Sequence, residues 1–382
     1  MTEKESALFS QYIIDGVRQD ATPAELFGEC MESVPEVVTG YDDIVDESTE
    51  PPVTTFTYDD SQKEEYLAEC LDASMQERTF RMLYPDSFTR LRIAHALTER
   101  IWNDGHFRLG DLSVWAEWYW NTRPLGNMAA FYISAETAGS YLFDLGVRLE
   151  GYGFEESDEE SIARFCAWLP DKEISETENS SEEVHFKSSP YESRHPWISE
   201  DRKCPEHMIA DEDSWIIYIP FDTCSFKIGG SLLAQTKGRN GGIGPGIKDP
   251  DYFIDCYEVV RELTEDGIIM AGVTVADGGL LTAAARMCGG LGCDLDISRL
   301  SASYQEEDTT KVLFGEVPGV LIQISEDNYD YVDSQLILQD VAYFPVGHPS
   351  AEHTGVKVSK TEKNGIAGIL ASLLSQTSEG ED

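Results

Sequence analysis

At residues 275–281 the chain reads Val-Ala-Asp-Gly-Gly-Leu-Leu, and the residues on both sides predict its local structure. Residues 263–272 indicate the end of a helix and a turn into a short apolar strand, while 282–288 has strong helix propensity. Asp277, Gly278 and Gly279 therefore precede a helix, where backbone N–H groups without partners bind phosphate and other anions. The alternative is that the two glycines only let the strand and the helix approach closely.

The sequence around this turn predicts alternating strands and helices. Gly229-Gly230-Ser231 forms a second glycine-rich turn into a helix, and 238–246 is a glycine loop beside Lys237 and Arg239. Apolar runs predict strands at 215–220, 295–297 and 320–324, and an edge strand at 341–346. We expect helices at 250–265 and 327–338, and a short helix at 365–374 in the tail.

The N-terminal half has a different pattern of elements. Helices are expected at 6–18, from Pro23, and at 88–103, and the acidic, Pro/Thr-rich segment 41–60 is expected to be a loop. A strand at 109–120, a helix at 126–143 and a strand at 145–153 suit an α/β or α+β layered domain. Trp115, Trp118, Tyr119 and Trp120 are assigned to a core or a subunit interface rather than to base stacking, because no basic residues lie between them. His95 and His106 are interpreted as bystanders beside an apolar helix face.

Composition limits the classes of function. The chain has 382 residues, room for about two or three domains, and 71 acidic against 28 basic residues give a net charge of −43. This charge argues against nucleic acid and anionic lipid as partners. Adaptation to high salt and local acidic segments are the two explanations, and the clustering of acid in residues 155–160 and 173–183 favours the second. With no long apolar run and no signal peptide at the N-terminus, we expect a cytoplasmic protein without a membrane span.

The cysteines and histidines do not match a known metal motif. The eight cysteines include no Cys-x-x-Cys pair, and Cys288 and Cys293 have no matching second pair, so we interpret them as reduced thiols. Residues 155–210 are long for a connection and read as an acidic insertion or linker. The histidines and the cysteine in this segment match no zinc spacing; they are His185, His195, Cys204 and His207.

Several short motifs, taken together, carry a family resemblance. They occur in order and at near-family spacing over roughly 70–350, at residues 75–79, 92–98, 112–118, 211–214, 229–235, 277–281 and 313–316. In this respect the chain resembles the phosphoribosylformylglycinamidine synthase branch of the AIR-synthase superfamily, specifically the second synthetase half of the large single-chain type.

The resemblance implies an α/β (α+β) fold of two domains. An N-terminal sheet domain would contribute to a barrel at the interface of a homodimer, with a C-terminal α/β domain beside it. The family uses ATP and Mg²⁺ to activate an amide oxygen for attack by ammonia. By resemblance, Asp277, Gly278 and Gly279 would bind phosphate, Gly229, Gly230 and Ser231 would line the cleft, and Glu316 would be the remaining carboxylate for Mg²⁺. The alternatives to ligand binding are structural: the glycines would only form a tight turn, and Glu316 would be a solvated or capping carboxylate.

The chain departs from the family at its ionic positions. The family's His-Asp-x-Ser-Asp-Gly-Gly becomes Val-Thr-Val-Ala-Asp-Gly-Gly at 273–279, and its Gly-Lys-Asp-Ser falls on Gly-Tyr-Gly-Phe-Glu at 151–155. Glu117 stands where the family strand has Asn. The glutaminase domain and the first synthetase half are absent from this sequence. No catalytic residue is therefore assigned.

Three hypotheses follow from these departures. The first is a degenerate homologue without synthase activity on its own that binds ATP, ADP or another phosphorylated small molecule. The second is an active ATP-dependent ligase or kinase on another substrate, with charge recruited from Lys227, Lys237 or Arg239. The third is an interaction protein that uses its acidic surface. The expected organisation is an extension at 1–69, domains at 70–154 and 211–350 separated by 155–210, and a tail at 351–382.

Overall fold

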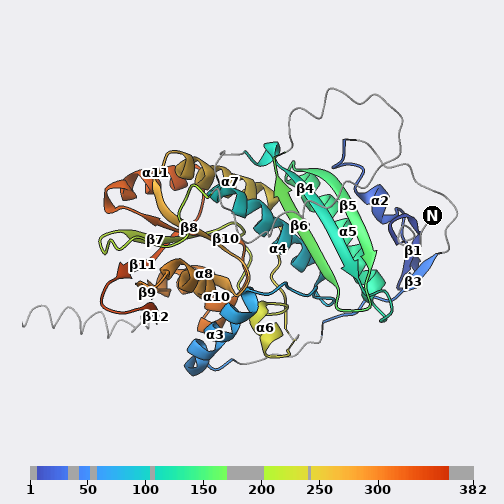
Figure 1. Ribbon diagram of the computed structural model, residues 1–382, viewed down its shortest axis with the longest axis horizontal. Coiled ribbons are helices and arrows are strands. Elements are labelled where there is room, and N and C mark those ends of the chain that lie inside the picture. Colours follow the sequence, from blue (N-terminus) through green and yellow to red (C-terminus); the bar gives the residue numbers. More distant parts are fainter. Residues whose placement is uncertain are drawn as a thin grey trace, which may run out of the picture.

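Two larger sheets, one from each half of the chain, lie beside each other with helix α4 between them (Figure 1). The computed structural model describes residues 7–32, 43–51, 58–103, 108–169, 202–239 and 242–360, and all structural statements concern these residues. The tail helix expected at 365–374 and three of the histidines, His106, His185 and His195, lie outside them. The α/β fold expected from the sequence is confirmed.

The N-terminal sheet has β4 (Ser113–Trp120) at its centre, parallel to β5 (Arg148–Glu156) and antiparallel to β6 (Ile162–Trp168). Helices α4 (Pro85–Thr98) and α5 (Asn127–Asp144) cover one face, where Trp118 and Trp120 are fully buried. The sequence therefore assigned these two tryptophans correctly to a core. Strand β6 corrects the expectation for residues 155–210. The first part of this range belongs to the N-terminal sheet and is not part of an insertion.

Residues 7–32 and 43–51 pack beside this sheet and do not begin with a long helix. The helix expected at 6–18 is wrong, because β1 (Tyr12–Ile14) and β2 (Val17–Arg18) form a hairpin there. Its turn residues Asp15 and Gly16 have φ of 53° and 76°, the left-handed pair that a two-residue hairpin needs. β3 (Ile44–Asp46) joins β1 in parallel, and α2 (Pro23–Leu26) begins at the expected proline.

Asp46, at the end of β3, ties the small sheet to the N-terminal domain. Its carboxylate accepts hydrogen bonds from the N–H groups of Gly126, Met128 and Ala129 at 2.8, 2.8 and 3.0 Å. These groups lie at the start of α5 and have no partner within the helix. A residue far away in the sequence therefore caps the longest helix of this domain.

The C-terminal sheet has the strand order β12-β9-β11-β7-β10-β8. All neighbours are antiparallel except β9 and β12. The strands are β7 (Trp215–Pro220), β8 (Ile269–Val275), β9 (Gly292–Asp296), β10 (Gly319–Ile324), β11 (Phe344–Ser350) and β12 (Gly355–Ser359). The edge strand expected at 341–346 is wrong, because β11 is an interior strand of this sheet. One edge is β12, which lies in the expected tail, and the other edge is β8.

Helices cover both faces of this sheet. On one face lie α3 (Lys63–Ser74), α6 (Leu232–Thr236), α8 (Gly279–Cys288), α9 (Ser298–Tyr304) and α10 (Thr309–Phe314). On the other face lie α7 (Pro250–Glu265) and α11 (Tyr329–Leu338), together with α4. Single 3₁₀ turns complete the chain: η1 (Asp60–Gln62), η2 (Glu99–Trp102), η3 (Leu109–Asp111) and η6 (Glu326–Asn328). Among the described residues, no helix combines the length and the apolar character needed to cross a bilayer.

The contact between the two larger sheets is apolar and closely packed. Trp102, fully buried at the end of η2, donates its indole N–H to the Thr274 hydroxyl at 2.9 Å. Its ring lies against Gly272 in β8, where an added Cβ would come within 2.4 Å of it. One continuous apolar core runs from β4 and α5 through α4 to β10.

Candidate functional site

Asp277 lies at the junction of the two domains, at the turn that connects β8 to α8. Gly278 and Gly279 have φ of 78° and 69°, in the left-handed region that favours glycine. A Cβ on Gly278 would lie 2.5 Å from the Thr282 hydroxyl, and one on Gly279 would lie 2.7 Å from the Phe314 backbone. Both glycines are therefore required by backbone conformation and by close packing. This agrees with the alternative left open by the sequence, in which the glycines let the strand and the helix approach closely.

The Asp277 carboxylate is held between two arginines of the N-terminal half. Nη1 of Arg78, from the segment between α3 and α4, contacts Oδ1, and Nη1 of Arg92, from α4, contacts Oδ2 at 2.7 Å. Burial opposes ionisation, but Arg78 and Arg92 outweigh it and hold the pKa of Asp277 well below its usual range. Asp277 is therefore an ionised carboxylate in a nearly closed setting, since only 11% of its side chain is exposed.

The carboxylate of Glu316, just after α10, accepts hydrogen bonds from backbone N–H groups at the two glycine turns that were predicted to bind a cofactor. Its Oε1 accepts from the backbone N–H groups of Leu232 and Gly278, at 2.7 and 2.9 Å, and its Oε2 accepts from Arg78 at 2.9 Å. The residue is 2% exposed. Burial and the nearby charge of Asp277 raise the pKa of the Glu316 carboxyl, while Arg78 and the two N–H groups oppose that shift.

Arg78 joins these two carboxylates to the other predicted glycine turn. Its Nη2 also donates to the carbonyl oxygen of Gly230 at 2.8 Å, and the residue is 5% exposed. We call Arg78, Arg92, Asp277 and Glu316 the ionic centre. It joins the N-terminal half of the chain to the start of α8 and to the segment after α10. Arg78 and Arg92 lie in the motifs of the resemblance, yet the sequence assigned them no role.

The predicted cleft residues Gly229, Gly230 and Ser231 lie beside the ionic centre and are closely packed. A Cβ on Gly229 would lie 2.5 Å from the backbone of Ile243, and one on Gly230 would lie 2.7 Å from the ring of Tyr84. Ser231 caps α6, accepting from Ala234 N–H at 3.2 Å. The structure thus brings together all six residues predicted to bind a cofactor, around the carboxylate of Glu316. Whether they bind a nucleotide stays a prediction.

A second polar group on α4 was not recognised in the sequence. His95 lies on the same side of α4 as Arg92, and its Nε2 is 3.8 Å from Oε1 of Glu99, the first residue of η2. Burial opposes ionisation of Glu99, but His95 and Arg202 outweigh it and lower its pKa to about 2. His95 therefore lies between two carboxylates, those of Glu99 and Asp277, and is not the bystander expected from sequence. The spacing of Arg92, His95 and Glu99 on one helix was the available signal.

The residues present do not fit Mg²⁺. Both oxygens of Glu316 already accept from N–H donors, and a guanidinium lies within hydrogen-bond distance. Magnesium requires several oxygen ligands, commonly including water. No group of three or more His, Cys, Asp or Glu in the described part of the chain is arranged to hold a metal ion.

The remaining residues considered from the sequence lie elsewhere. Lys237 forms ion pairs with Glu65 and Glu69 of α3, at 3.1 and 2.7 Å. Glu117 lies on the outer face of the N-terminal sheet, where it accepts from the indole N–H of Trp115 at 3.0 Å. Phe154 packs on Phe131 inside the N-terminal domain and does not reach the ionic centre.

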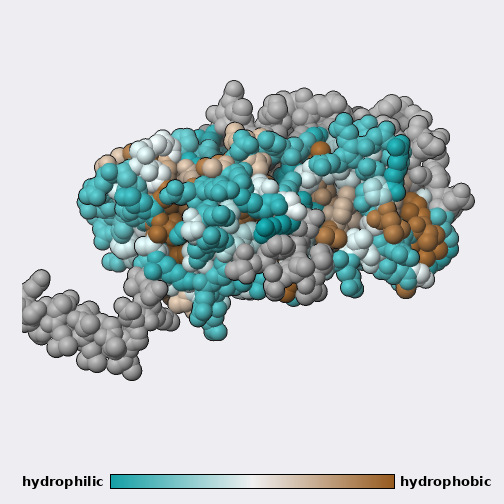
Figure 2. Space-filling model, turned by 90° about the horizontal axis from the view of Figure 1, so that it is seen from below, coloured by the Kyte–Doolittle hydropathy of each residue, from teal (hydrophilic) through white to brown (hydrophobic). Residues whose placement is uncertain are grey.

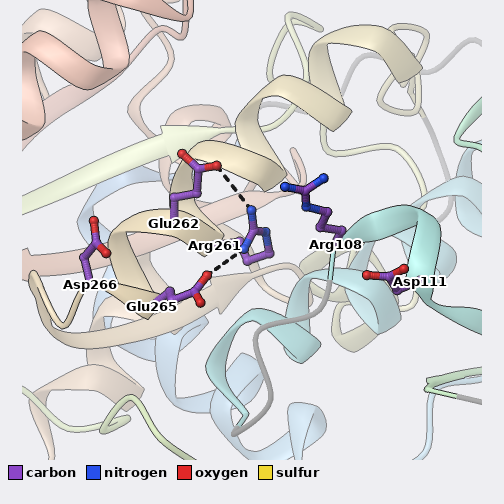
Figure 3. A pocket seen from close by; sticks show the side chains of 6 residues that line it. All are labelled: Arg108, Asp111, Arg261, Glu262, Glu265 and Asp266. Atoms are coloured by element: carbon purple, nitrogen blue, oxygen red, sulfur yellow. Dashed lines mark hydrogen bonds and ion pairs between the residues drawn. The ribbon is translucent and has the colours of Figure 1, made fainter.

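Two surface hollows are lined largely by charged side chains. One, of about 430 Å³, lies between α7 and η3, where Figure 3 shows Arg261 flanked by Glu262 and Glu265 and faced by Arg108. The other, of about 640 Å³, is strongly acidic; its lining is Asp211, Glu212, Asp213, Ser325, Glu326, Asp327 and His348. Neither lining offers the apolar wall that a nucleotide base needs. The face drawn in Figure 2 is mostly hydrophilic where it is coloured, with a few apolar patches, in keeping with the net charge of −43.

Sequence comparison relates the chain to one enzyme family. It is 24% identical over 269 residues to a probable phosphoribosylformylglycinamidine synthase of Arabidopsis thaliana, covering 70% of this chain and 18% of that protein. It is 23% identical over 283 residues to the Homo sapiens phosphoribosylformylglycinamidine synthase, covering 73% of this chain and 20% of that protein. No family model matches the chain. The chain spans about a fifth of the length of these relatives.

Solved structures with a similar arrangement include PurL of Thermotoga maritima complexed with FGAR, at 11% identity and a TM-score of 0.49 over 72% of this chain and 41% of that one. The same protein complexed with ATP gives a TM-score of 0.47 at 11% identity, over 74% and 40%. HypE of E. coli, a hydrogenase maturation protein, gives 0.43 at 11% identity, over 72% and 77%. The sequence relatives confirm the resemblance stated from the motifs: over about 70% of its length the chain is similar to phosphoribosylformylglycinamidine synthases.

Proposed function

We propose that this chain keeps the scaffold of its synthase relatives without synthase activity on its own. The observation that carries this proposal is the position of Glu316. Its carboxylate accepts hydrogen bonds from the N–H groups of Gly278 and Leu232 and forms an ion pair with Arg78. An internal carboxylate thus stands where the resemblance implied a phosphate. The ionic centre then serves to hold the two domains together.

The energetics support a structural role. Arg78 and Glu316 are both more than nine-tenths buried, and separating such a pair costs about 3–5 kcal/mol because a charge is left without a partner. A phosphate that used the N–H group of Gly278 would have to displace Glu316 and meet that cost. Dense negative charge over the rest of the chain adds repulsion against a nucleotide.

The side chains that the chemistry requires are also replaced. Val273, Thr274 and Ala276 stand where the family motif has His, its first Asp and Ser, and all three are buried. At 151–155 the chain has neither lysine nor aspartate. Activation of an amide oxygen needs cationic groups aimed at developing charge, and the arginines of the ionic centre are already paired with carboxylates.

Turnover and calorimetry test this proposal together. Formylglycinamide ribotide, ammonium, ATP and Mg²⁺ are incubated with the purified chain, and phosphate release and amidine formation are measured. We expect neither product above the protein-free control, and no heat of binding with ATP or ADP up to millimolar concentration. Amidine formation would overturn the proposal. Nucleotide binding without turnover would retain the absence of activity but refute a closed ionic centre.

We further propose that two copies of the chain associate through the outer face of the N-terminal sheet. In the part of the chain that the structure describes, helices cover only the other face, and the outer face presents half-buried Trp115, Tyr119, Ile162 and Cys166. Such a face is expected to be buried against a partner surface. Light scattering coupled to gel filtration should give a dimer for the wild type and a monomer for Ile162→Glu, while Val17→Glu, on the exposed hairpin, should remain a dimer. A wild-type monomer at micromolar concentration would contradict this.

One observation favours the interaction hypothesis as a second function. The acidic hollow near β7 contains five carboxylates and no lysine or arginine in its lining. The ring of His348, in the lining, lies 4.2 Å from the ring of Trp215 between centroids, with the two planes tilted by 52°. A basic segment of another protein would fit this chemistry. Its binding should weaken steeply with salt, and an affinity independent of salt concentration would argue against it.

A further inference from the structure

The two edges of the C-terminal sheet differ, because β8 is closed and β12 is open. At β8 the N–H group of Gly272 donates to the carbonyl oxygen of Pro205 at 2.9 Å, and Arg202 donates to the carbonyl oxygen of Gly272. At the other edge, β9 is the only strand of the described residues that pairs with β12. Figure 1 shows β12 at the end of the sheet away from the N-terminal domain.

The hydrogen bonds to β9 fix which backbone groups of β12 point outward. Gly355 donates its N–H group to the residue before β9 at 3.0 Å, and the carbonyl oxygen of Ser359 accepts from the residue after β9 at 3.2 Å. In a parallel pair, alternate residues of a strand bond to the same neighbour, so every second residue from Gly355 to Ser359 faces β9. The N–H and C=O groups of Val356 and Val358 therefore point away from β9, where they meet no partner among the described residues.

This edge has few of the features that keep an edge strand from pairing. The register of β12 with β9 is regular over five residues, without a proline or a bulge. Val356 and Val358 are half-buried and pack on the apolar core under α8. Lys357, which is exposed, is the only charged residue of the strand. Such an edge is a template for an extended segment of another chain.

Lys357 determines the chemistry of a segment that fits. It lies on the face opposite to the two valines, in register with Asp294 of β9. Asp294 already pairs with His353 at 3.0 Å, and Lys357 forms no ion pair with any described residue. A residue directly opposite Lys357 on an added strand comes within about 5 Å between Cβ atoms, and an opposite charge at that position stabilises the pair. An acidic residue is therefore favoured there.

A second copy of this chain fits the edge less well. In the antiparallel register that uses all the outward groups, Val356 of one copy pairs with Val358 of the other. The two Lys357 side chains then stand directly opposite each other, and like charges in that position destabilise a strand pair. The segment that fits has an acidic residue between two apolar residues.

We propose that β12 binds an extended segment of another protein as an added strand of the C-terminal sheet. Its acidic residue lies opposite Lys357, and its two apolar residues lie opposite Val356 and Val358. Both backbone groups of each valine then form hydrogen bonds with the segment. The apolar side chains of the segment extend the core under α8.

Peptide titration of the full chain, labelled with ¹⁵N-valine and followed by NMR, tests the proposal. The probe is the blocked peptide Thr-Val-Glu-Val-Thr, in about 0.15 M salt to screen distant charges. We expect the amide signals of Val356 and Val358 to shift, because each N–H group gains an acceptor. The amide of Val346, in interior strand β11, should not shift.

A charge exchange tests the role of Lys357. The peptide with lysine in place of glutamate should bind the wild type about fivefold more weakly, and Lys357→Glu should reverse this preference. The net charge of −43 by itself favours the lysine peptide, so it cannot produce the expected wild-type preference. A wild type that prefers the lysine peptide would contradict the proposal.

Val358→Pro blocks the edge at one position. Its missing N–H group points away from β9, so the ladder to β9 is kept, and proline is tolerated at such positions. This variant should lose peptide binding, while Val358→Thr, which keeps the N–H group and a similar shape, should retain it. If Val358→Pro does not fold, the charge exchange at Lys357 decides the matter.

Three results would overturn the proposal. The first is that the amides of Val356 and Val358 do not shift up to millimolar peptide. The second is that these amides exchange with solvent as slowly in the free chain as that of Lys357, which would show that the edge is already paired. The third is that they shift with protein concentration in the absence of peptide, which would assign the edge to a second copy of the chain.

Discussion

Replacing Glu316 with alanine tests the ionic centre directly. The change removes three hydrogen bonds, to Arg78 Nη2 and to the N–H groups of Leu232 and Gly278, at 2.9, 2.7 and 2.9 Å. All of them are buried, and Arg78 would keep only Asp277 and the Gly230 carbonyl as partners. Breaking one side of a buried ion pair costs about 3–5 kcal/mol, so we expect the free energy of unfolding to fall by about 4 kcal/mol.

Urea unfolding followed by tryptophan fluorescence measures this loss, because Trp102, Trp118 and Trp120 are fully buried. Glu316→Gln, which keeps the shape and one carbonyl oxygen, should lose less than the alanine variant. Glu65→Ala is the matched control for an exposed ion pair, and its cost should stay below about 1 kcal/mol. A loss below about 1 kcal/mol for Glu316→Ala would refute the reasoning, since that is the value of an ordinary surface pair.

The same variant offers a second readout. Without the carboxylate, the N–H groups of Leu232 and Gly278 and the guanidinium of Arg78 surround a space that suits an anion. Inorganic phosphate should therefore raise the unfolding midpoint of Glu316→Ala more than that of the wild type, by ligand linkage. An identical phosphate effect on both proteins would show that Glu316 does not hold the place of an anion.

Three further perturbations follow from the structure. In the folded state the pKa of Glu99 falls from 4.5 to about 2, and the pKa of Asp277 is also lowered. Both carboxylates therefore stabilise the folded state above their unfolded pKa values. This contribution should be complete above about pH 5 and should be lost as the pH falls toward 2, which urea midpoints measured across pH would show. A midpoint that does not change over that range would contradict it. Asp46→Ala removes three hydrogen bonds at the start of α5 and should cost about 2 kcal/mol, with Asp46→Asn intermediate, by the same assay. Gly278→Ala combines a φ of 78° with a Cβ 2.5 Å from a hydroxyl and should lower the free energy of unfolding by about 3 kcal/mol. Gly267→Ala, with a φ of 70° and no atom within 4 Å of the added Cβ, should lower it by about 1 kcal/mol. Equal losses would show that close packing at Gly278 is unimportant.

The buried strands and the long helices could be predicted from sequence. Residues 215–220 and 320–324 are unbroken apolar runs, and the structure has β7 and β10 there because both faces of those strands are covered by helices. The helix at 250–265 begins and ends as expected, since Asp249 caps it and Pro250 starts it.

The errors have identifiable physical causes. Apolar residues in 6–18 fit a helical period, but the Asp15-Gly16 turn has the left-handed conformation of a hairpin and the strands pair across it. Strand β6 was hidden because acidic residues precede it and its sequence alternates only over seven residues. The order of β11 and β12 depends on pairing with β9, and pairing between distant segments is not written in local sequence.

The same limit applies to the candidate site. Glycine positions in the turns were correctly located, because a turn leaves a local signature. Arg78 meets Asp277 across 199 residues of sequence, and Glu316 across 238, so no spacing rule could have paired them. The sequence identified Glu316 as an available carboxylate; the structure shows which donors already use it.

The indole of Trp102 resting on Gly272 has a consequence for how the molecule comes apart. Because this contact belongs to an apolar core shared by both halves, neither half can open without exposing the other. Heating should therefore give a single calorimetric transition, and chains cut near residue 210 should yield insoluble pieces. Enlarging residue 272 by one methyl group should loosen both halves at once, far beyond the strand that carries it.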